Sequence, residues 1–266
     1  MTEPLLAHRM DGVGGGETLL LLNGGFMSMA SWEPCAAPLA ERFRVLRCDF
    51  RGQLLTPGPA HRELGPSVED VARLLDHLGL DRVHVVGTSF GGEVGLLLAA
   101  RRPDRVASLV AVTVSEQTTE AMSRGTRDLS RVVADLLAGG DRGRFHDHLV
   151  GEIYSRSYIA ENAEVLAARR RQIAAIPDVW FAAVDDLLAA VEHFDLRPEL
   201  ASIRCPTLVV VAGDDRAMPP ERGRALAAAI PGAHLVEHPT SGHALFAEQP
   251  AWLVEQISTF LEGLRS

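Results

Sequence analysis

The chain has 266 residues, of which 47% are hydrophobic, and a formal net charge of −9. A chain of this length and composition can bury a large core, and it fits one domain with an insertion better than two separate domains. Acidic and basic residues are interspersed, so the sequence offers neither the basic face that nucleic acid requires nor a polybasic membrane patch. We therefore expect a small-molecule partner and no nucleic acid or membrane, while homo-oligomer formation stays open.

The N-terminal residues lack a charged segment followed by an apolar stretch, and the longest apolar runs are only as long as strands. Neither a secretory signal nor a membrane-spanning helix is therefore predicted. The cysteines Cys35, Cys48 and Cys205 form no metal-type pair, and none lies in the glycine-supported turn that a nucleophile would need. We expect a cytoplasmic protein with reduced, buried thiols.

The first part of the chain reads as alternating strands and helices. Short strands are predicted at 5–10 and 17–22, and the glycine-rich residues 11–16 are predicted to join them as a hairpin turn. A helix is expected at 31–42, with Ser31 as its N-cap and Pro34 in its first turn. The elements expected next are a strand at 44–48, an amphipathic helix at 67–78, a strand at 82–86, a helix from 92 and a strand at 106–114.

Strand-type runs vanish between about 116 and 192, where Ala, Arg, Leu and Asp recur at helical spacing. Strand and helix alternation on both sides of this block indicates an α/β fold, with a mostly parallel sheet, helices on both of its faces and an inserted helical cap. The predicted division is a core of 1–115 and 201–266 and a cap of 116–200. The remaining expected elements are helices at 128–137, 160–176, 179–191, 222–229 and 252–264, and strands at 207–211 and 234–236.

The motif Gly87–Gly91 has the spacing of a nucleophile elbow, because Ser89 stands between glycines two positions to either side. A strand is predicted before it and a helix after it. Such a turn strains the serine, and side chains at the flanking positions would collide. The Ser89 hydroxyl is then presented at the end of a strand and at the positive end of a helix.

A serine hydroxyl needs a base to remove its proton, and the base needs a carboxylate to hold its tautomer. His243 is the candidate base, because it follows a short strand in a glycine-containing loop and such loops converge with the elbow at one edge of the sheet. Asp215, just after the strand at 207–211, is the candidate acid. Asp214 and Glu116 remain alternatives for that role.

With these residues the chain resembles the α/β-hydrolase superfamily over nearly its whole length. The resemblance is carried by the elbow, Asp215, Gly242-His243, the segment 49–52 and the position of the helical block. It implies a serine hydrolase fold with a lid, loosely similar to enol-lactone hydrolases and small-metabolite esterases. No metal and no organic cofactor is implied.

The resemblance also implies an oxyanion loop after the first core strand, where relatives usually have His-Gly and this chain has Asn23-Gly24. By family register the backbone amides of Gly25 and Phe90 are the oxyanion donors, with Phe26 as a fallback donor that otherwise lines the pocket. A second departure follows at 53–56, where relatives continue with glycine and serine. It either reshapes the pocket floor or alters a surface turn.

Substrate contacts are expected from Phe26, Met27 and the lid residue Trp180, although Trp180 also fits the role of anchoring the lid on the sheet. The expected lid helix carries three consecutive arginines, Arg169, Arg170 and Arg171. They either bind an acidic substrate or form a solvated face with salt bridges. Consecutive helical residues point in different directions, which favours the second role. The leading hypothesis is a cofactor-free hydrolase of an ester, lactone or thioester. The alternatives are a carbon–carbon bond hydrolase, an acyltransferase, an aminopeptidase, or a non-catalytic small-molecule receptor.

Overall fold

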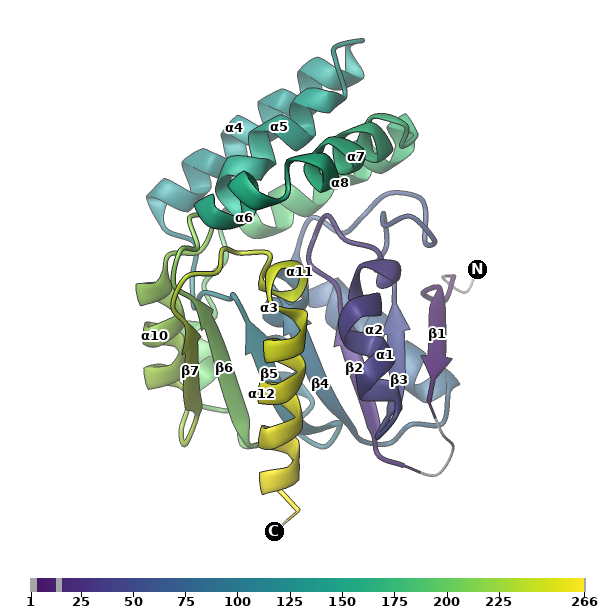
Figure 1. Cartoon of the computed structure of the whole chain (residues 1–266). Coiled ribbons are helices and arrows are strands. Elements are labelled where there is room, and N and C mark those ends of the chain that lie inside the picture. Colours follow the sequence, from purple (N-terminus) through teal and green to yellow (C-terminus); the bar gives the residue numbers. More distant parts are fainter. Residues whose placement is uncertain (1–3, 13–15, 266) are drawn as a thin grey trace.

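A computed structural model describes residues 4–12 and 16–265 (Figure 1). Within these residues the centre is a seven-stranded sheet in the order β1-β3-β2-β4-β5-β6-β7. Every neighbouring pair is parallel except β1 and β3, so the predicted mostly parallel sheet is confirmed. The strands are β1 (His8–Asp11), β2 (Thr18–Leu22), β3 (Arg44–Cys48), β4 (Val83–Thr88), β5 (Val106–Val112), β6 (Thr207–Ala212) and β7 (His234–His238).

The predicted hairpin between the first two strands is wrong. β1 pairs antiparallel with β3, with His8 opposite Cys48, and β3 lies between β1 and β2. β2 has β3 on one side and β4 on the other, so both of its hydrogen-bonding edges are already in use. Residues 13–15 of the predicted turn lie outside the described residues.

The helices of the core cover both faces of the sheet, as predicted. Successive residues of a strand point to opposite faces. Leu19 and Leu21 of β2 accordingly join the cluster that contains residues of α1 (Glu33–Ala40) and α12 (Pro250–Gly263). Leu20 and Leu22 join the cluster on the other face. The helices of that second cluster are α2 (Leu64–His77), α3 (Phe90–Arg101) and α10 (Pro220–Ala229), and the short helices α9 (Arg197–Leu200) and α11 (Leu245–Glu248) complete the core.

The start of the predicted helix at 31–42 differs from the expectation. A 3-10 turn, η1 (Met29–Trp32), precedes α1, and Ser28 is the N-cap of that turn. Ser31 lies inside the turn, where its hydroxyl accepts a hydrogen bond from the Ser28 amide at 3.3 Å. Pro34 does lie in the first turn of α1, where its missing N–H costs nothing.

The helices formed by residues 120–192, between β5 and β6, lie above the carboxyl ends of the parallel strands (Figure 1). The predicted single helix at 160–176 is two helices, because Asn162 departs from helical geometry (φ −123°) and its side chain bonds the Tyr158 carbonyl at 3.0 Å. A helix at 143–153 escaped the sequence analysis. The cap helices are α4 (Glu120–Leu137), α5 (Gly143–Ile153), α6 (Arg156–Glu161), α7 (Ala163–Ala174) and α8 (Asp178–Glu192).

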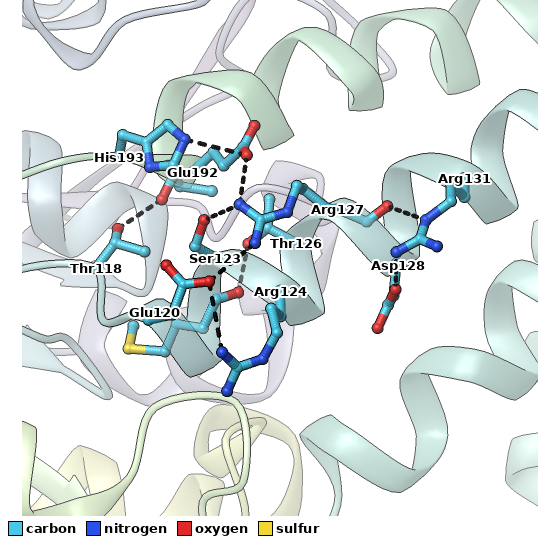
Figure 2. Close-up of polar contacts among 12 residues, drawn as sticks. Thr118, Glu120, Ser123, Arg124, Thr126, Arg127, Asp128, Arg131, Glu192 and His193 are labelled. Atoms are coloured by element: carbon cyan, nitrogen blue, oxygen red, sulfur yellow. Dashed lines mark hydrogen bonds and ion pairs between the residues drawn. The ribbon is translucent and has the colours of Figure 1, made fainter.

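The two segments that connect the cap to the core run side by side. Gln117 forms a β-bridge with Asp195, and the Thr118 amide donates to the Phe194 carbonyl at 2.9 Å. Polar contacts of Arg127 tie the ends of α4 and α8 together beside this junction. Figure 2 shows these contacts, which are with Glu120, Ser123 and Glu192. Among the described residues, no helix is both long and apolar enough to cross a membrane.

Candidate active site

Ser89 lies at the sharp turn between β4 and α3. Its φ is 51° and its ψ is −126°, a conformation that costs energy for a residue with a side chain. Hydrogen bonds on both sides hold the turn, since the Ser89 amide donates to the Val112 carbonyl at 3.0 Å and the Ser89 carbonyl accepts from Gly92 at 2.7 Å. The hydroxyl is therefore fixed at the carboxyl end of a central strand.

The neighbouring glycines allow the backbone to pass through this turn. A Cβ on Gly87 would lie 2.3 Å from the Gly91 carbonyl oxygen, and one on Gly91 would lie 2.5 Å from the Leu22 carbonyl oxygen. A Cβ on Gly92 would lie 2.2 Å from Val114. The close approach predicted at Gly87 and Gly91 is present, and Gly92 shows it as well, so larger residues at these positions would push the serine out of place.

His243 and Asp215 meet from two separate loops. Asp215 follows β6, His243 follows β7, and the Nδ1 atom of His243 lies 2.8 Å from Oδ2 of Asp215. The other carboxylate oxygen, Oδ1, accepts the Met218 amide at 2.7 Å. Because the Asp215 side chain is only 1% exposed, water does not compete for it, and the histidine ring is held with Nε2 available.

The two alternative acids are occupied elsewhere. Asp214 accepts the backbone amide of Arg156 at 3.2 Å, and Glu116 pairs with Arg222 at 2.9 Å. Neither forms a hydrogen bond with the ring of His243 in the described part of the chain. The geometry therefore pairs the histidine with Asp215.

One cavity of about 870 Å³ brings the remaining predicted site residues together. Ser89 and His243 both line it, although among residues 4–12 and 16–265 no hydrogen bond joins the Ser89 hydroxyl to the His243 ring. Asp215 is buried behind His243 and is absent from the wall. The other predicted residues that line the cavity are Gly25, Phe26, Met27, Phe90 and Trp180.

The loop after β2 brings the two predicted oxyanion donors close together. The Met27 amide bonds the Gly24 carbonyl at 3.1 Å and closes a tight turn around Gly25. A Cβ on Gly25 would lie 3.8 Å from the Cβ of Phe90, so the two residues are neighbours. Phe90 is the first residue of α3, where backbone amides have no partner within the helix. Both amides therefore belong to the part of the wall next to Ser89.

A buried glutamine that no sequence pattern marks holds this loop in place. Gln53 is fully buried, its Nε2 donates to the Gly24 carbonyl at 2.8 Å, and its Oε1 accepts from Nδ2 of Asn23 at 2.8 Å and from the Phe50 amide at 2.9 Å. The two departures from the family pattern, at 23 and 53, thus contact each other. The segment at 53–56 places the buried side-chain amide of Gln53 beneath the loop, so Gln53 does not belong to a surface turn.

Asp49 completes this buried network. Its carboxylate accepts Nδ2 of Asn23 at 3.1 Å, the Met29 amide at 2.5 Å and the Leu55 amide at 2.8 Å. Burial raises the pKa of the Asp49 carboxyl, and the two backbone amides and Asn23 oppose that rise by stabilising the charged form. The loops after β2 and β3 are thereby joined by side chains that never reach solvent.

Aromatic residues form the cap side of the cavity. Phe145 packs edge-to-face against Phe26 at 5.4 Å and against Trp180 at 5.6 Å. Trp180 belongs to a hydrophobic cluster made of cap helices, whereas Leu187 on the same helix joins the core of the sheet. Trp180 is therefore part of the cavity wall and of the cap's own core, and other residues of α8 anchor the cap.

The cysteines take no part in the site. All three are free and buried, which confirms the prediction of buried thiols. Burial raises the pKa of Cys35 and of Cys48 to about 12, so neither forms the reactive thiolate near neutral pH. In the described residues, no group of three or more His, Cys, Asp or Glu side chains is arranged to hold a metal ion.

A family model described as "alpha/beta hydrolase fold" matches residues 17–250. The chain belongs to this family, and it is a hydrolase. It is 31% identical over 259 residues to "Putative carbamate hydrolase RutD" of Caulobacter segnis, covering 94% of this chain and 93% of that one. The predicted resemblance is thereby confirmed.

Two solved structures are similar over nearly the full length. The enol-lactonase from Burkholderia xenovorans is 28% identical with a TM-score of 0.84, covering 97% of this chain and 96% of that chain. A thermophilic esterase from Thermogutta terrifontis is 28% identical with a TM-score of 0.83, covering 98% and 94%. The three relatives are named for three different bonds, so the family alone leaves the substrate open.

Proposed function

We propose that this α/β hydrolase is a cofactor-free serine hydrolase that cleaves an ester, lactone or thioester of a small, partly apolar substrate. The observation that carries the proposal is the 2.8 Å hydrogen bond between His243 and Asp215 at a cavity that Ser89 also lines. Binding alone has no use for a serine on a strained turn beside an imidazole that a buried carboxylate orients.

In the first step Ser89 attacks the carbonyl carbon of the substrate while Nε2 of His243 takes the hydroxyl proton. Asp215 holds the proton on Nδ1, so that Nε2 is free to accept, and its negative charge stabilises the imidazolium that forms. Because the hydroxyl and the ring are not yet hydrogen-bonded, the substrate or a small side-chain rotation completes this contact.

The attack moves negative charge onto the carbonyl oxygen. The amides of Gly25 and Phe90 lie next to each other beside Ser89 and are the proposed donors for this oxyanion. One such donor typically lowers the barrier by about 2.7–4 kcal/mol, provided that it is already in place before the reaction. We assign to Gln53 the positioning of the Gly24–Gly25 loop, since its side chain bonds the Gly24 carbonyl from below.

Collapse of the tetrahedral intermediate releases the leaving group, which takes the proton from His243, and leaves an acyl group on Ser89. Water then attacks the acyl carbon while His243 removes its proton, and the same two amides stabilise the second oxyanion. When this intermediate collapses, the bond between the acyl carbon and the Ser89 oxygen breaks and His243 returns the proton to Ser89. The products are the free acid and the leaving group. All proton transfers in this sequence use His243, and Asp215 stays ionised throughout.

Carbamate hydrolysis is the second candidate, favoured by the name of the relative at 31% identity. A carbamate also presents a carbonyl carbon to the serine, so Ser89, His243 and the oxyanion amides would keep their roles. The two candidates differ in the leaving group and in the acyl portion. Phe26, Met27 and Trp180, which line the cavity, are the residues we propose to contact these portions.

A substrate panel tests the proposal. The purified protein is assayed with p-nitrophenyl esters, lactones, acyl-thioesters and carbamates of increasing chain length, next to the Ser89→Ala variant. We expect at least one class to be hydrolysed and Ser89→Ala to lower its turnover by about four to six orders of magnitude, with the fold intact by circular dichroism. More than a tenth of the wild-type activity in that variant would contradict the proposal.

A further inference from the structure

Two arginines in the cavity wall differ from Arg170, which directly follows one of them in the chain. Arg170 of α7 is neutralised by Asp147 at 2.9 Å and by Asp141 at 2.8 Å on the surface of the cap. Its neighbour Arg169 and the loop residue Arg216 both line the cavity. Within the described residues, neither of these two forms an ion pair with a carboxylate. Two positive charges therefore face the substrate space without a counter-charge of their own.

Both guanidinium groups are held on one residue, Tyr154. Nη2 of Arg216 donates to the Tyr154 carbonyl at 2.5 Å. Arg169 donates to the Tyr154 hydroxyl, and its guanidinium lies 5.6 Å from the centre of the ring. Tyr154 is 3% exposed and stacks on Tyr158, so packing fixes its position. The two long side chains are thus oriented before any ligand arrives, which lowers the entropy lost on binding.

Arg216 also has an unused donor. Its Nε atom is buried and has no hydrogen-bond partner in the described residues. A guanidinium carries five N–H donors, and a carboxylate can accept from two of them at once. Because Arg216 lines the cavity, an anionic group there can accept from the guanidinium N–H groups that Tyr154 does not use.

The position of Arg216 connects it to the reaction centre. It follows Asp215 in the chain, and the Tyr154 segment that holds it packs on the loop of His243. The Ala244 amide donates to the Ile153 carbonyl at 2.8 Å, and a Cβ on Gly242 would lie 2.7 Å from the carbonyl carbon of Tyr154. The unpaired charge therefore lies on the same wall as the proposed catalytic base.

Two acidic residues of the wall do not cancel this charge. Asp128 pairs with Arg131 on the surface of α4, and Glu152 is exposed to solvent, where its field is screened. His146 and His148 also line the cavity and add no negative charge. Two further carboxylates lie beside the Tyr154 segment, but Glu248 accepts from Ser155 and from the Gly242 amide, and Asp214 accepts the Arg156 amide. Neither forms an ion pair with Arg169 or Arg216 in the described part of the chain.

We propose that Arg169 and Arg216 form a carboxylate subsite, so that the substrate is an ester, lactone or thioester whose acyl portion carries a second, ionised acid group. This inference rests on the proposed function and narrows its substrate class. Hydrolysis breaks the bond between the acyl carbon and the leaving group. Water supplies a hydroxyl to the acyl carbon and a proton to the leaving group, and the remote carboxylate is unchanged. The product acid is therefore a dicarboxylic acid.

Matched substrates test the subsite. Mono-p-nitrophenyl esters of succinate, glutarate and adipate are compared with the esters whose free carboxylate is replaced by a primary amide of the same length. We expect the wild type to favour the carboxylate form of the best-fitting length by roughly 10- to 100-fold in kcat/KM, the range that a charge-assisted hydrogen bond provides. Arg216→Gln and Arg169→Gln should each reduce this preference severalfold.

The chain offers two matched controls. Arg171 lies on the same helix as Arg169 but is exposed and outside the cavity wall, so Arg171→Gln should leave the preference unchanged. Arg216→Lys keeps the positive charge and should retain more of the preference than Arg216→Gln. A neutral substitution that slowed both substrates equally, or a wild type that treated both alike, would overturn the subsite and leave the proposed hydrolase intact.

A binding measurement separates the subsite from catalysis. Glutarate should raise the thermal midpoint of the wild type, glutaramide should not, and the Arg169→Gln, Arg216→Gln double variant should lose the response. If no ester were hydrolysed and yet glutarate bound through both arginines, the proposed function would fail and the carboxylate site would stand. Equal responses to glutarate in the wild type and the double variant would overturn the site.

Discussion

On the core side of the cavity the polar side chains are buried and bonded, whereas the charged side chains of the cap lie mostly at the surface in ion pairs. Asp215, Gln53 and Asp49 are all almost completely buried, and each makes more than one hydrogen bond. Arg127 and Arg170 of the cap are each 40% exposed and pair with carboxylates. The core holds polar groups where they can orient a reaction, and the cap places most of its charges where water screens them.

The largest effect is expected from Asp215, the buried acid of the core, because we propose that it orients His243 for catalysis. Asp215→Asn keeps the size of the side chain but presents an amide to Nδ1 of His243, which favours the wrong tautomer. We expect kcat to fall about 10⁴-fold. Asp214→Asn is the matched control and should keep most of the activity, because the Asp214 side chain bonds only the Arg156 amide among the contacts described. A larger loss at Asp214 than at Asp215 would reverse the assignment.

A smaller effect is expected from Gln53. Gln53→Glu keeps an acceptor for Asn23 and for the Phe50 amide but removes the donor to the Gly24 carbonyl. The oxyanion loop loses its support, and a displacement of the order of 1 Å at a reacting group can cost about 100-fold. We expect kcat to fall by roughly 10- to 100-fold with a much smaller change in KM. A residue that merely stabilised the fold would lower the thermal midpoint and leave kcat unchanged.

Glu93 shows the cost of a buried core carboxylate without a partner. The side chain is completely buried, neither oxygen has a hydrogen-bond partner among the described residues, and burial raises its pKa to about 8. The folded state then holds the proton more tightly than the unfolded state, so stability from Glu93 is present at low pH and is lost as the pH rises toward 8. Compared with Glu93→Gln, the wild type should lose up to roughly 4 kcal/mol of unfolding free energy between about pH 5 and pH 9.

Chemical denaturation of both proteins across this pH range checks the expectation. The free energies of unfolding of wild type and Glu93→Gln could instead change with pH in parallel. That result would show that the charged Glu93 carboxylate is either exposed to water or hydrogen-bonded in the folded protein. Because Gln has nearly the same shape, packing is held constant between the two proteins.

The smallest effect is expected from the cap. Arg127 bridges Glu120 and Glu192 (Figure 2), but it is well exposed and long side chains lose entropy when they pair. Arg127→Gln should change the unfolding midpoint by little more than the error of the measurement, and high salt should remove even that difference. A large loss of stability would show that this exposed ion pair contributes as much as the buried polar groups of the core, which would contradict the difference between the two regions.

The sequence predicts the parts of the fold that depend on local patterns. Continuous apolar runs such as that of β2 predict buried parallel strands, and the glycines around Ser89 predict the strained turn because no other residue fits there. The partner of β1 was mispredicted, since a short strand with a glycine-rich turn looks the same whether it pairs with the next strand or the one after.

Contacts between residues far apart in the chain could not be predicted from the sequence. Gln53 bonds residues 29 and 30 positions away, and no local pattern marks such a pairing. In the cap, Asn162 breaks a continuous helical pattern without glycine or proline, so the sequence predicts one helix where the structure has two. The division of the chain at 116 and 200 and the catalytic roles of the site residues stay predictions that the experiments above address.

Reaction with a fluorophosphonate, followed by mass spectrometry of the intact protein and of its peptides, tests most directly whether Ser89 is an activated nucleophile. We expect one adduct per chain, located on Ser89, with none in Ser89→Ala and a much slower reaction in His243→Ala. An adduct on another residue, or an equal rate of labelling without the imidazole, would contradict it.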